Sequence, residues 1–325
     1  MQQPRHNLSR TILALFAAAF LLYTPAIVRA EDTPVTLGIS PAISDIQIGR
    51  GQTLRREITI DNKAATPVAV RVYAENFEAA GPYGAVSFNT DNTKQYSASS
   101  WLKLGNQNLV LNPHERQTLT FSISTPADAE PGGHYAAIFF EPVAAISSTN
   151  SSSIGISQRV GALLFITVGG NNTEQGSVLG AQTSSKCTGL QCSFKTDTWR
   201  EWGPVPFSFS FENTGNVHMK VSGKITITDM FGRIMAEVPV DEKTVLPGSS
   251  RAFEATWLRE VLFGRYNAKL ALVYGTQRRS ETAAISFWVI PWRAIIAGIV
   301  LVSLTGLTIY IVRRRIRRRA ARKHT

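Results

Sequence analysis

The sequence predicts an all-β protein made of two tandem immunoglobulin-like β-sandwiches, with an N-terminal signal peptide and one C-terminal transmembrane α-helix. Three observations support this fold class. Short runs of alternating apolar and polar residues are separated by turn-rich stretches, the pattern of these runs occurs twice, and an uncharged run precedes a basic C-terminus. Many short alternating runs, without a long segment of helical period, are typical of antiparallel sandwiches.

The N-terminus has the order of a secretory signal peptide. Arg5 and Arg10 precede the apolar run 12–23, and small residues at Val28 and Ala30 stand before Glu31. A basic start, a short apolar run and small residues at positions −3 and −1 are typical of a segment that is cleaved after export. We expect cleavage after residue 30, and an uncleaved anchor is the alternative.

The repeated pattern places two related sandwiches between the termini. Ile58-Thr-Ile60 leads into Asn62, and Phe209-Ser-Phe211 leads into Asn213, with apolar residues at the same later offsets. Each copy closes with Gly-x-Tyr-x-Ala, where an immunoglobulin-type sandwich places its tyrosine corner. The expected organisation is a signal peptide (1–30), a first sandwich (31–169), a linker (170–176), a second sandwich (177–290), a membrane helix with an interfacial start (291–312) and a basic tail (313–325).

Aromatic residues in irregular stretches are the candidate contacts for a ligand or partner. The first copy is 20 residues longer between its asparagine and its tyrosine, mainly in 77–100, and this insertion carries Tyr83, Phe88 and Tyr96. Such side chains can anchor a sugar or a protein, although packing within their own loop is the alternative. A serine-rich loop at 146–157 is a second long insertion, and long loops on a rigid sandwich often carry binding sites.

The start of the second copy carries a further aromatic pair and the two cysteines. Trp199 and Trp202 are expected to fill the joint between the sandwiches, with ligand contact as the alternative. Cys187 and Cys192 are the only cysteines of the chain, and four residues separate them. Outside the cytoplasm this spacing favours a short structural disulfide across a hairpin.

The C-terminus has the composition of a membrane anchor. Residues 294–312 form 19 positions without a charge, and a helix of that length spans about 28 Å, close to the ~30 Å of a bilayer core. Phe287, Trp288 and Trp292 are expected at the outer interface, which favours aromatic residues. The basic residues that follow are expected to remain cytoplasmic; they include Arg313, Arg314, Arg315, Arg317, Arg318 and Arg319.

Net charge and motif content exclude several functions. Residues 1–30 carry +3 and residues 291–325 carry +9 of the formal net charge of +11, so residues 31–290 carry −1. This near-neutral part lacks the basic excess that nucleic-acid binding requires. The sequence also has no H-E-x-x-H, C-x-x-C or G-x-S-x-G pattern, and its five histidines are scattered. We predict a non-enzyme without catalytic, metal-binding or cofactor-binding residues, and we interpret His134 as a polar strand-edge residue.

Several short motifs carry a resemblance to a known family. They are Ser40-Pro41, Gly51-Gln-Thr, Ile60-Asp-Asn62, Trp101-Leu, Pro131-Gly-Gly-His-Tyr135, Leu246-Pro-Gly and Gly264-Arg-Tyr266, followed by the helix with a basic end. In this order they resemble the WxL-interacting cell-surface proteins. The resemblance implies a peptidoglycan-binding first domain and a second domain that binds other proteins. The first sandwich also looks like the pilus-chaperone type, although the chain lacks paired basic residues for anchoring a subunit carboxylate.

Two functional hypotheses follow. The first is a single-pass protein of the cell membrane, anchored in the lipid bilayer through 294–312, whose extracytoplasmic sandwiches bind peptidoglycan or other surface proteins. The second is a structural or chaperone-like accessory subunit of a larger extracytoplasmic membrane complex. Co-purification of a stoichiometric protein partner distinguishes the second hypothesis from the first.

Overall fold

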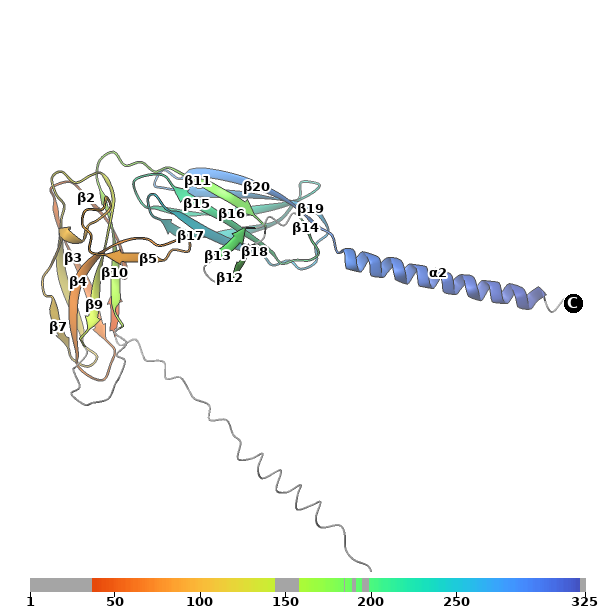
Figure 1. Ribbon diagram of the computed structural model, residues 1–325, viewed down its shortest axis with the longest axis horizontal. Coiled ribbons are helices and arrows are strands. Elements are labelled where there is room, and N and C mark those ends of the chain that lie inside the picture. Colours follow the sequence, from red (N-terminus) through yellow and green to blue (C-terminus); the bar gives the residue numbers. More distant parts are fainter. Residues whose placement is uncertain (1–36, 144–157, 184, 189–190, 195–198, 322–325) are drawn as a thin grey trace, which may run out of the picture. The chain divides into compact units, whose positions relative to one another are not determined.

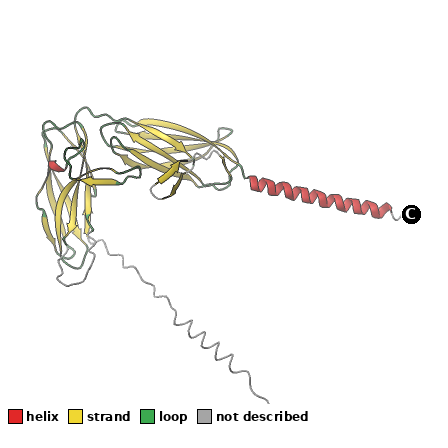
Figure 2. Ribbon diagram, viewed as in Figure 1, coloured by secondary structure: helices red, strands yellow, loops and turns green. Residues whose placement is uncertain are grey.

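The computed structural model describes residues 37–143, 158–183, 185–188, 191–194 and 199–321, with the backbone alone for 185–188, 191–194 and 315–321. The expected signal peptide and the loop 146–157 lie outside these residues. Within them the protein is mostly β and ends in one apolar helix, as the sequence predicts (Figures 1 and 2).

The first sandwich contains ten strands in two sheets. One sheet has the order β1-β3-β8-β6, and the other has the order β2-β10-β9-β4-β5, with β7 also paired to β4. Apolar side chains from both sheets, among them Ile60, Ile123 and Phe140, form its core. The strands are β1 (Leu37–Ser40), β2 (Ile43–Ile48), β3 (Thr53–Asn62), β4 (Val68–Ala79), β5 (Val86–Asn89), β6 (Leu102–Leu104), β7 (Asn108–Leu111), β8 (Arg116–Ser124), β9 (Gly132–Pro142) and β10 (Val160–Val168), and a 3₁₀ turn, η1, covers Ser99–Trp101.

The chain passes from one sheet to the other near its start. β1 pairs antiparallel with β3, whereas β2 pairs parallel with β10. Pro41 stands between β1 and β2, and proline has no N–H to donate to a continuing ladder. This switch places β2 at the edge of the larger sheet, with Asp45 and Gln47 two residues apart and therefore on one face.

The second sandwich has its own core. β11-β15-β18 form one sheet, β14-β20-β19-β16-β17 form the other, and β12 pairs with β13 as a hairpin. The core is rich in aromatic rings, and Phe209 stacks on Phe253 with ring centroids 5.2 Å apart. The strands are β11 (Gly176–Gln182), β12 (Ser185–Thr188), β13 (Gln191–Phe194), β14 (Trp199–Arg200), β15 (Val205–Asn213), β16 (Met219–Asp229), β17 (Ile234–Val245), β18 (Ser250–Trp257), β19 (Gly264–Tyr274) and β20 (Arg279–Val289).

Two buried asparagines occupy the same place in the two copies. Asn62 ends β3 and donates to the carbonyls of Thr66, Leu111 and Asn112. Asn213 ends β15 and donates to the carbonyls of Val217 and Val245. Both side chains are fully buried, and each amide ties the turn after its strand to a neighbouring strand end. The repeat in the sequence therefore corresponds to a repeated structural device.

The two tyrosines of the closing motif behave differently. Tyr266 donates its hydroxyl to the carbonyl of Phe263, three residues upstream, as a tyrosine corner does. Tyr135 is buried among aromatic rings and makes no such bond to its own upstream turn within the described residues. The expected corner is therefore present in the second copy alone.

The helix α2 runs from Trp292 to Ala321. Its first part, Trp292–Arg314, is the one helix of the described residues that is long and apolar enough to cross a membrane. Ser303, Thr305 and Thr308 direct their hydroxyls to carbonyls of the preceding turn, so these polar groups are satisfied within the helix. The helix continues into the basic segment, which we had expected to follow it as a tail.

Candidate functional site

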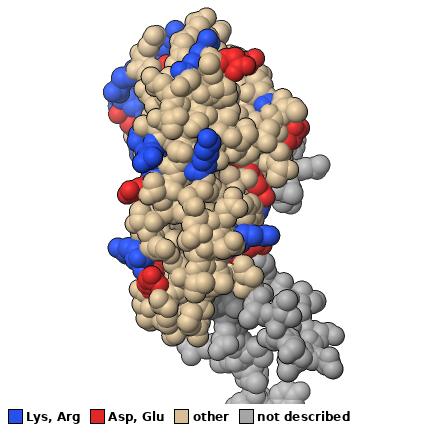
Figure 3. All heavy atoms as spheres, turned by 90° about the vertical axis from the view of Figure 1, so that its left-hand side faces the viewer, with Lys and Arg blue, Asp and Glu red and all other residues tan. Residues whose placement is uncertain are grey.

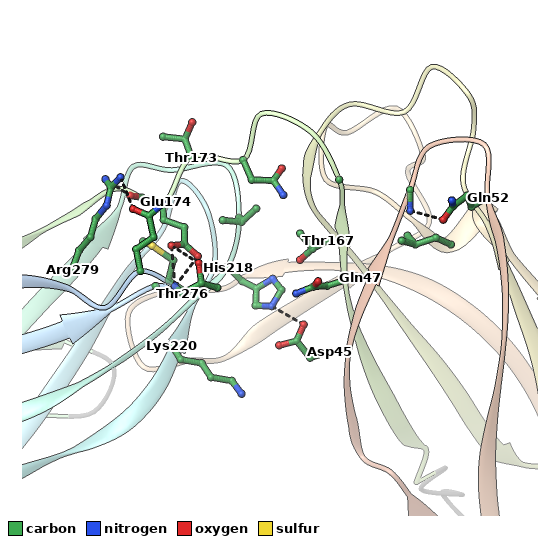
Figure 4. Close-up of a pocket in the computed structure, with 18 residues that line it drawn as sticks. Asp45, Gln47, Gln52, Thr167, Thr173, Glu174, His218, Lys220, Thr276 and Arg279 are labelled. Atoms are coloured by element: carbon green, nitrogen blue, oxygen red, sulfur yellow. Dashed lines mark hydrogen bonds and ion pairs between the residues drawn. The ribbon is translucent and has the colours of Figure 1, made fainter.

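A cleft of about 890 Å³ lies between the two sandwiches, and side chains of both sandwiches line it (Figure 4). One wall comes from β2 and β10, which contribute Asp45, Gln47 and Thr167. The other wall comes from the second sandwich and includes the segment before β11, the start of β16 and the β19–β20 turn; it contributes Glu174, His218, Lys220, Thr276 and Arg279. The cleft is therefore polar, with charges of both signs.

His218 stands at the centre of the cleft and reaches across it. Its Nε2 lies 3.4 Å from a carboxylate oxygen of Asp45, and its side chain is 7% exposed. The ring also packs against Phe165, with centroids 5.0 Å apart. Burial lowers the pKa of His218 below its ordinary value even though Asp45 acts to raise it. At neutral pH the imidazole is therefore uncharged and acts as a packed element of the joint.

Glu174 fixes the expected linker to the second sandwich. Its carboxylate accepts hydrogen bonds from the backbone N–H of Thr276 at 2.9 Å and from the Thr276 hydroxyl at 3.1 Å. Arg279 donates to the Glu174 backbone carbonyl at 2.9 Å. The segment between the sandwiches is thus bound to the β19–β20 turn, although its composition predicts a polar connection and gives no sign of these bonds.

Asn216 makes the main backbone contact between the sandwiches. Its carbonyl accepts from the N–H of Gly133 at 2.8 Å, and its side-chain oxygen accepts from the N–H of Thr173 at 2.7 Å. Its amide nitrogen lies 3.2 Å from the carbonyls of Pro131 and Asn171 and donates to both. Gly132 has φ of 133°, and a β-carbon there would meet the Asn216 carbonyl at 2.6 Å, so this approach requires glycine.

The inserted segment of the first sandwich makes a second contact. The backbone N–H of Ala252 in β18 donates to the carbonyl of Pro82 at 2.7 Å, which ties the tip of the β4–β5 hairpin to the second sandwich. Phe88 and Tyr96 pack on their own sandwich, against Phe139 at 4.8 Å and Tyr135 at 6.3 Å between ring centroids. Tyr83 is more exposed, at the hairpin tip. The ligand-contact role of these three residues stays a prediction.

Trp199 and Trp202 lie away from the joint, contrary to our expectation. Trp199 pairs with Trp288 at the end of β20, whereas the joint lies near the start of β20 at Arg279. Both tryptophans are substantially exposed. Parallel pairing of the short β14 with β20 carries them to that end of the sheet, and nothing in their local sequence indicates this.

Two further expectations about aromatic residues are wrong. Phe287 is fully buried in the second core, where it stacks on Tyr266, and it does not face an interface. His134 is buried and packs against Trp101 in a tilted arrangement, with ring centroids 4.4 Å apart, and it donates from Nε2 to the carbonyl of Glu130. Burial lowers the pKa of His134. Tertiary packing of β9, which is covered on both faces, overrides the strand-edge interpretation.

The charged side chains that line the cleft are of both signs. Acidic and basic side chains are interspersed on the face that Figure 3 shows, without a continuous basic stripe. Among the described residues, no three His, Cys, Asp or Glu side chains gather as a metal site would require. In the cleft, Lys220 and the Gln47 amide are hydrogen-bond donors, and Asp45 and Thr167 supply acceptors. Such a set suits a polar segment of another chain.

The sequence singled out for the site none of the residues that line the cleft, Asp45 and His218 included, nor Asn216 at the joint. The turn-forming composition of 213–216 indicates a loop, but only the three-dimensional arrangement shows that Asn216 meets Gly133.

Comparisons with known proteins find similarity to solved structures alone. No protein-family model and no curated protein matches it. Among solved structures, it is similar to the class 5 fimbriae chaperone CfaA at 11% identity, over 77% of this chain and 98% of that one, with a TM-score of 0.40. It is also similar to the E. coli chaperone DraB at 11% identity, over 78% and 95%, with a TM-score of 0.36. A Porphyromonas gingivalis W83 protein of unknown function matches at 11% identity, over 78% and 100%, with a TM-score of 0.29.

Proposed function

We propose that this protein is a membrane-anchored, non-enzymatic accessory subunit that binds another extracytoplasmic protein in the cleft between its sandwiches. α2 holds it in the cell membrane with the sandwiches outside and the basic end in the cytoplasm. This is the chaperone-like or structural alternative among the functions that the sequence suggests.

The observation that carries the proposal is that hydrogen bonds between the two sandwiches hold them together beside an open, polar cleft. The Gly133–Asn216 and Ala252–Pro82 backbone bonds hold the two sandwiches at two separate places. A preformed surface loses less conformational entropy on binding than two modules that move independently. The cleft thus offers a partner a fixed arrangement of donors and acceptors from both sandwiches.

The donors and acceptors of the cleft favour a protein segment as the occupant. Lys220 is exposed, and Asp45 is half exposed opposite it, so a chain in the cleft can satisfy both charges with its own polar groups. A nucleic acid would require a basic excess, which residues 31–290 lack because their net charge is −1.

Site-specific photocrosslinking in intact cells tests the proposal. A photoreactive amino acid replaces Lys220 in the cleft, and the matched control places it at Lys269, which is exposed on β19 and outside the cleft. We expect one defined protein adduct from position 220 and none from position 269. Lys220→Glu should weaken co-purification of the same partner in mild detergent, whereas Lys269→Glu should leave it unchanged.

Two outcomes would contradict the proposal. Equal crosslinking at both positions would mean that the cleft has no special role. Retention of the purified chain on isolated peptidoglycan, without any protein adduct at position 220, would instead favour the wall-binding function that the WxL-interacting resemblance implies.

A further inference from the structure

Exposed apolar side chains of the second sandwich gather at one end. Among its described residues with large exposed apolar side chains, Leu179 alone lies elsewhere. The others lie in the β16–β17 turn and at the start of β17, in the β18–β19 loop, and around β14 and the end of β20. We call them the apolar rim: Trp199, Trp202, Met230, Phe231, Ile234, Leu258, Val261, Phe263 and Trp288.

Strand pairing brings these loops together. Gly264, which begins β19, pairs with Val289 at the end of β20, and Asp229, which ends β16, pairs with Tyr266. The β16–β17 turn therefore adjoins the end of β20. A β-carbon on Gly264 would meet the Met230 methyl at 2.7 Å, so the turn lies directly against the β18–β19 loop.

The tryptophan segment is held at the same end. The N–H of Gly203 donates to the carbonyl of Glu260 at 3.0 Å, which ties this segment to the β18–β19 loop. Trp199 pairs with Trp288, so β14 adds a further pair of aromatic rings beside the loops.

α2 starts at this same end of the sandwich. Only Ile290 and Pro291 separate Val289 from Trp292, and the three residue steps between them reach about 11 Å at most. The N–H of Ile290 donates to the carbonyl of Arg200 at 2.8 Å, so this connection is bound to β14. The polar layer on each side of a bilayer is about 5–8 Å thick, and a helix that begins at Trp292 leaves the rim within reach of it.

Composition of the rim fits a lipid surface. Its side chains are mostly aromatic or branched, and Phe231 and Leu258 are 76% and 78% exposed. Tryptophan is enriched where proteins meet the membrane interface. Basic residues outnumber acidic ones among and beside the rim, and such an excess suits anionic headgroups. The basic residues are Arg200, Arg233, Arg259, Arg265 and Arg293, and the acidic residues are Glu201, Asp229 and Glu260.

We propose that the apolar rim inserts into the outer interface of the bilayer and holds the second sandwich against the membrane. The inference rests on the anchoring role proposed for α2 and adds a second, peripheral contact made by loops far apart in sequence. Continuity with the helix favours lipid over a protein as the occupant, because the rim lies where the chain enters the membrane.

Depth-dependent quenching tests the inference in the full chain. In a Cys187→Ser, Cys192→Ser background, single cysteines are introduced by Phe231→Cys, Val261→Cys, Leu307→Cys or Val110→Cys and labelled with an environment-sensitive fluorophore. Val110 is the matched control, because it is as exposed as the rim but lies in the first sandwich. Each labelled chain is placed in nanodiscs of phosphatidylcholine and phosphatidylglycerol, with or without brominated acyl chains.

We expect brominated lipid to quench the labels at positions 231, 261 and 307 and to leave the label at position 110 unaffected. Quenching at 307 without quenching at 231 and 261 would overturn the rim proposal while leaving the anchor intact. Absence of quenching at 307 would instead overturn the anchor itself, and with it this inference. Photocrosslinking from 231 to a protein, together with no lipid quenching, would identify the rim as a protein-binding surface and would also overturn the proposal.

Discussion

Removal of the Asn213 side chain provides a quantitative test of the reasoning about the joint. Asn213 is fully buried, and its amide donates to the carbonyls of Val217 at 2.8 Å and Val245 at 2.9 Å. Its side-chain oxygen also accepts from the N–H of Gly215 at 2.9 Å. These bonds shape the turn that presents Asn216 to the first sandwich. Asn213→Ala deletes all three while leaving the backbone sequence of the turn unchanged.

The expected loss of stability follows from the backbone groups that would lose their partners. The N–H of Gly215 keeps an acceptor, because it also donates to the carbonyl of Gln175 at 3.0 Å. Each of the two carbonyls that lose their donor, Val217 and Val245, costs about 1 kcal/mol or more, so together they cost about 2 kcal/mol. For a domain of this size, 1 kcal/mol corresponds to about 4 °C in the unfolding midpoint. We therefore expect Asn213→Ala to lower the thermal midpoint of the second sandwich by about 8 °C.

Thermal unfolding of the purified full chain in mild detergent, followed by circular dichroism, measures this change. Amide hydrogen exchange shows which part of the sandwich is destabilised. Protection of the backbone amides should fall first in residues 214–219 and around Val245. Asn267→Ala is the matched control; its side chain is exposed on β19 and bonds to the Ser286 hydroxyl. An exposed substitution of this kind should change stability by less than about 0.5 kcal/mol.

The reasoning also requires an effect at the joint. Loss of the Asn213 bonds should increase exchange at Gly133, because Asn216 supplies its hydrogen-bond partner. A midpoint within the range of the Asn267→Ala control would refute the claim that the buried amide organises this turn. A large drop in midpoint with unchanged exchange at Gly133 would refute the link between the turn and the joint.

The remaining predictions concern pH, the cysteines and the anchor. Burial lowers the pKa of His218 and of His134, and around His218 the facing charges are Asp45, Lys220 and Glu174. In the unfolded chain both histidines keep a pKa of about 6.5, so below that pH the unfolded chain binds more protons than the folded chain does. The thermal unfolding midpoint should therefore fall as the pH is lowered. His218→Gln should make the midpoint depend less steeply on pH. An unchanged slope in both His218→Gln and His134→Gln would contradict this. Cys187 pairs with Cys192 across the β12–β13 hairpin, so mass spectrometry should detect alkylation of both only after reduction, and the double serine variant should lose about 2 kcal/mol. Truncation after Ile290 keeps β20 complete and should release a folded protein to the medium; recovery of the truncated chain with washed membranes would argue against α2 as the anchor.

Part of the candidate site could be predicted from the sequence. The sequence shows the two asparagines, Asn62 and Asn213, as a repeat, because in each copy a buried side-chain amide must bond the turn after a strand to a neighbouring strand end. The insertion at 77–100 is visible because it lengthens one copy. Its contact through Pro82 with β18 is not visible, because a backbone hydrogen bond between distant segments leaves no pattern in either segment.

The sequence by itself determined the mostly β character and the apolar C-terminal helix, because alternation and hydropathy are local properties of consecutive residues. It also assigned the basic excess to the two ends of the chain, which removed any reason to expect a nucleic-acid partner. Only the tertiary structure decided that Trp199 lies near the start of α2, and that His218 lies between the sandwiches. Strand order and register set those positions, and these depend on pairings between residues far apart in the chain.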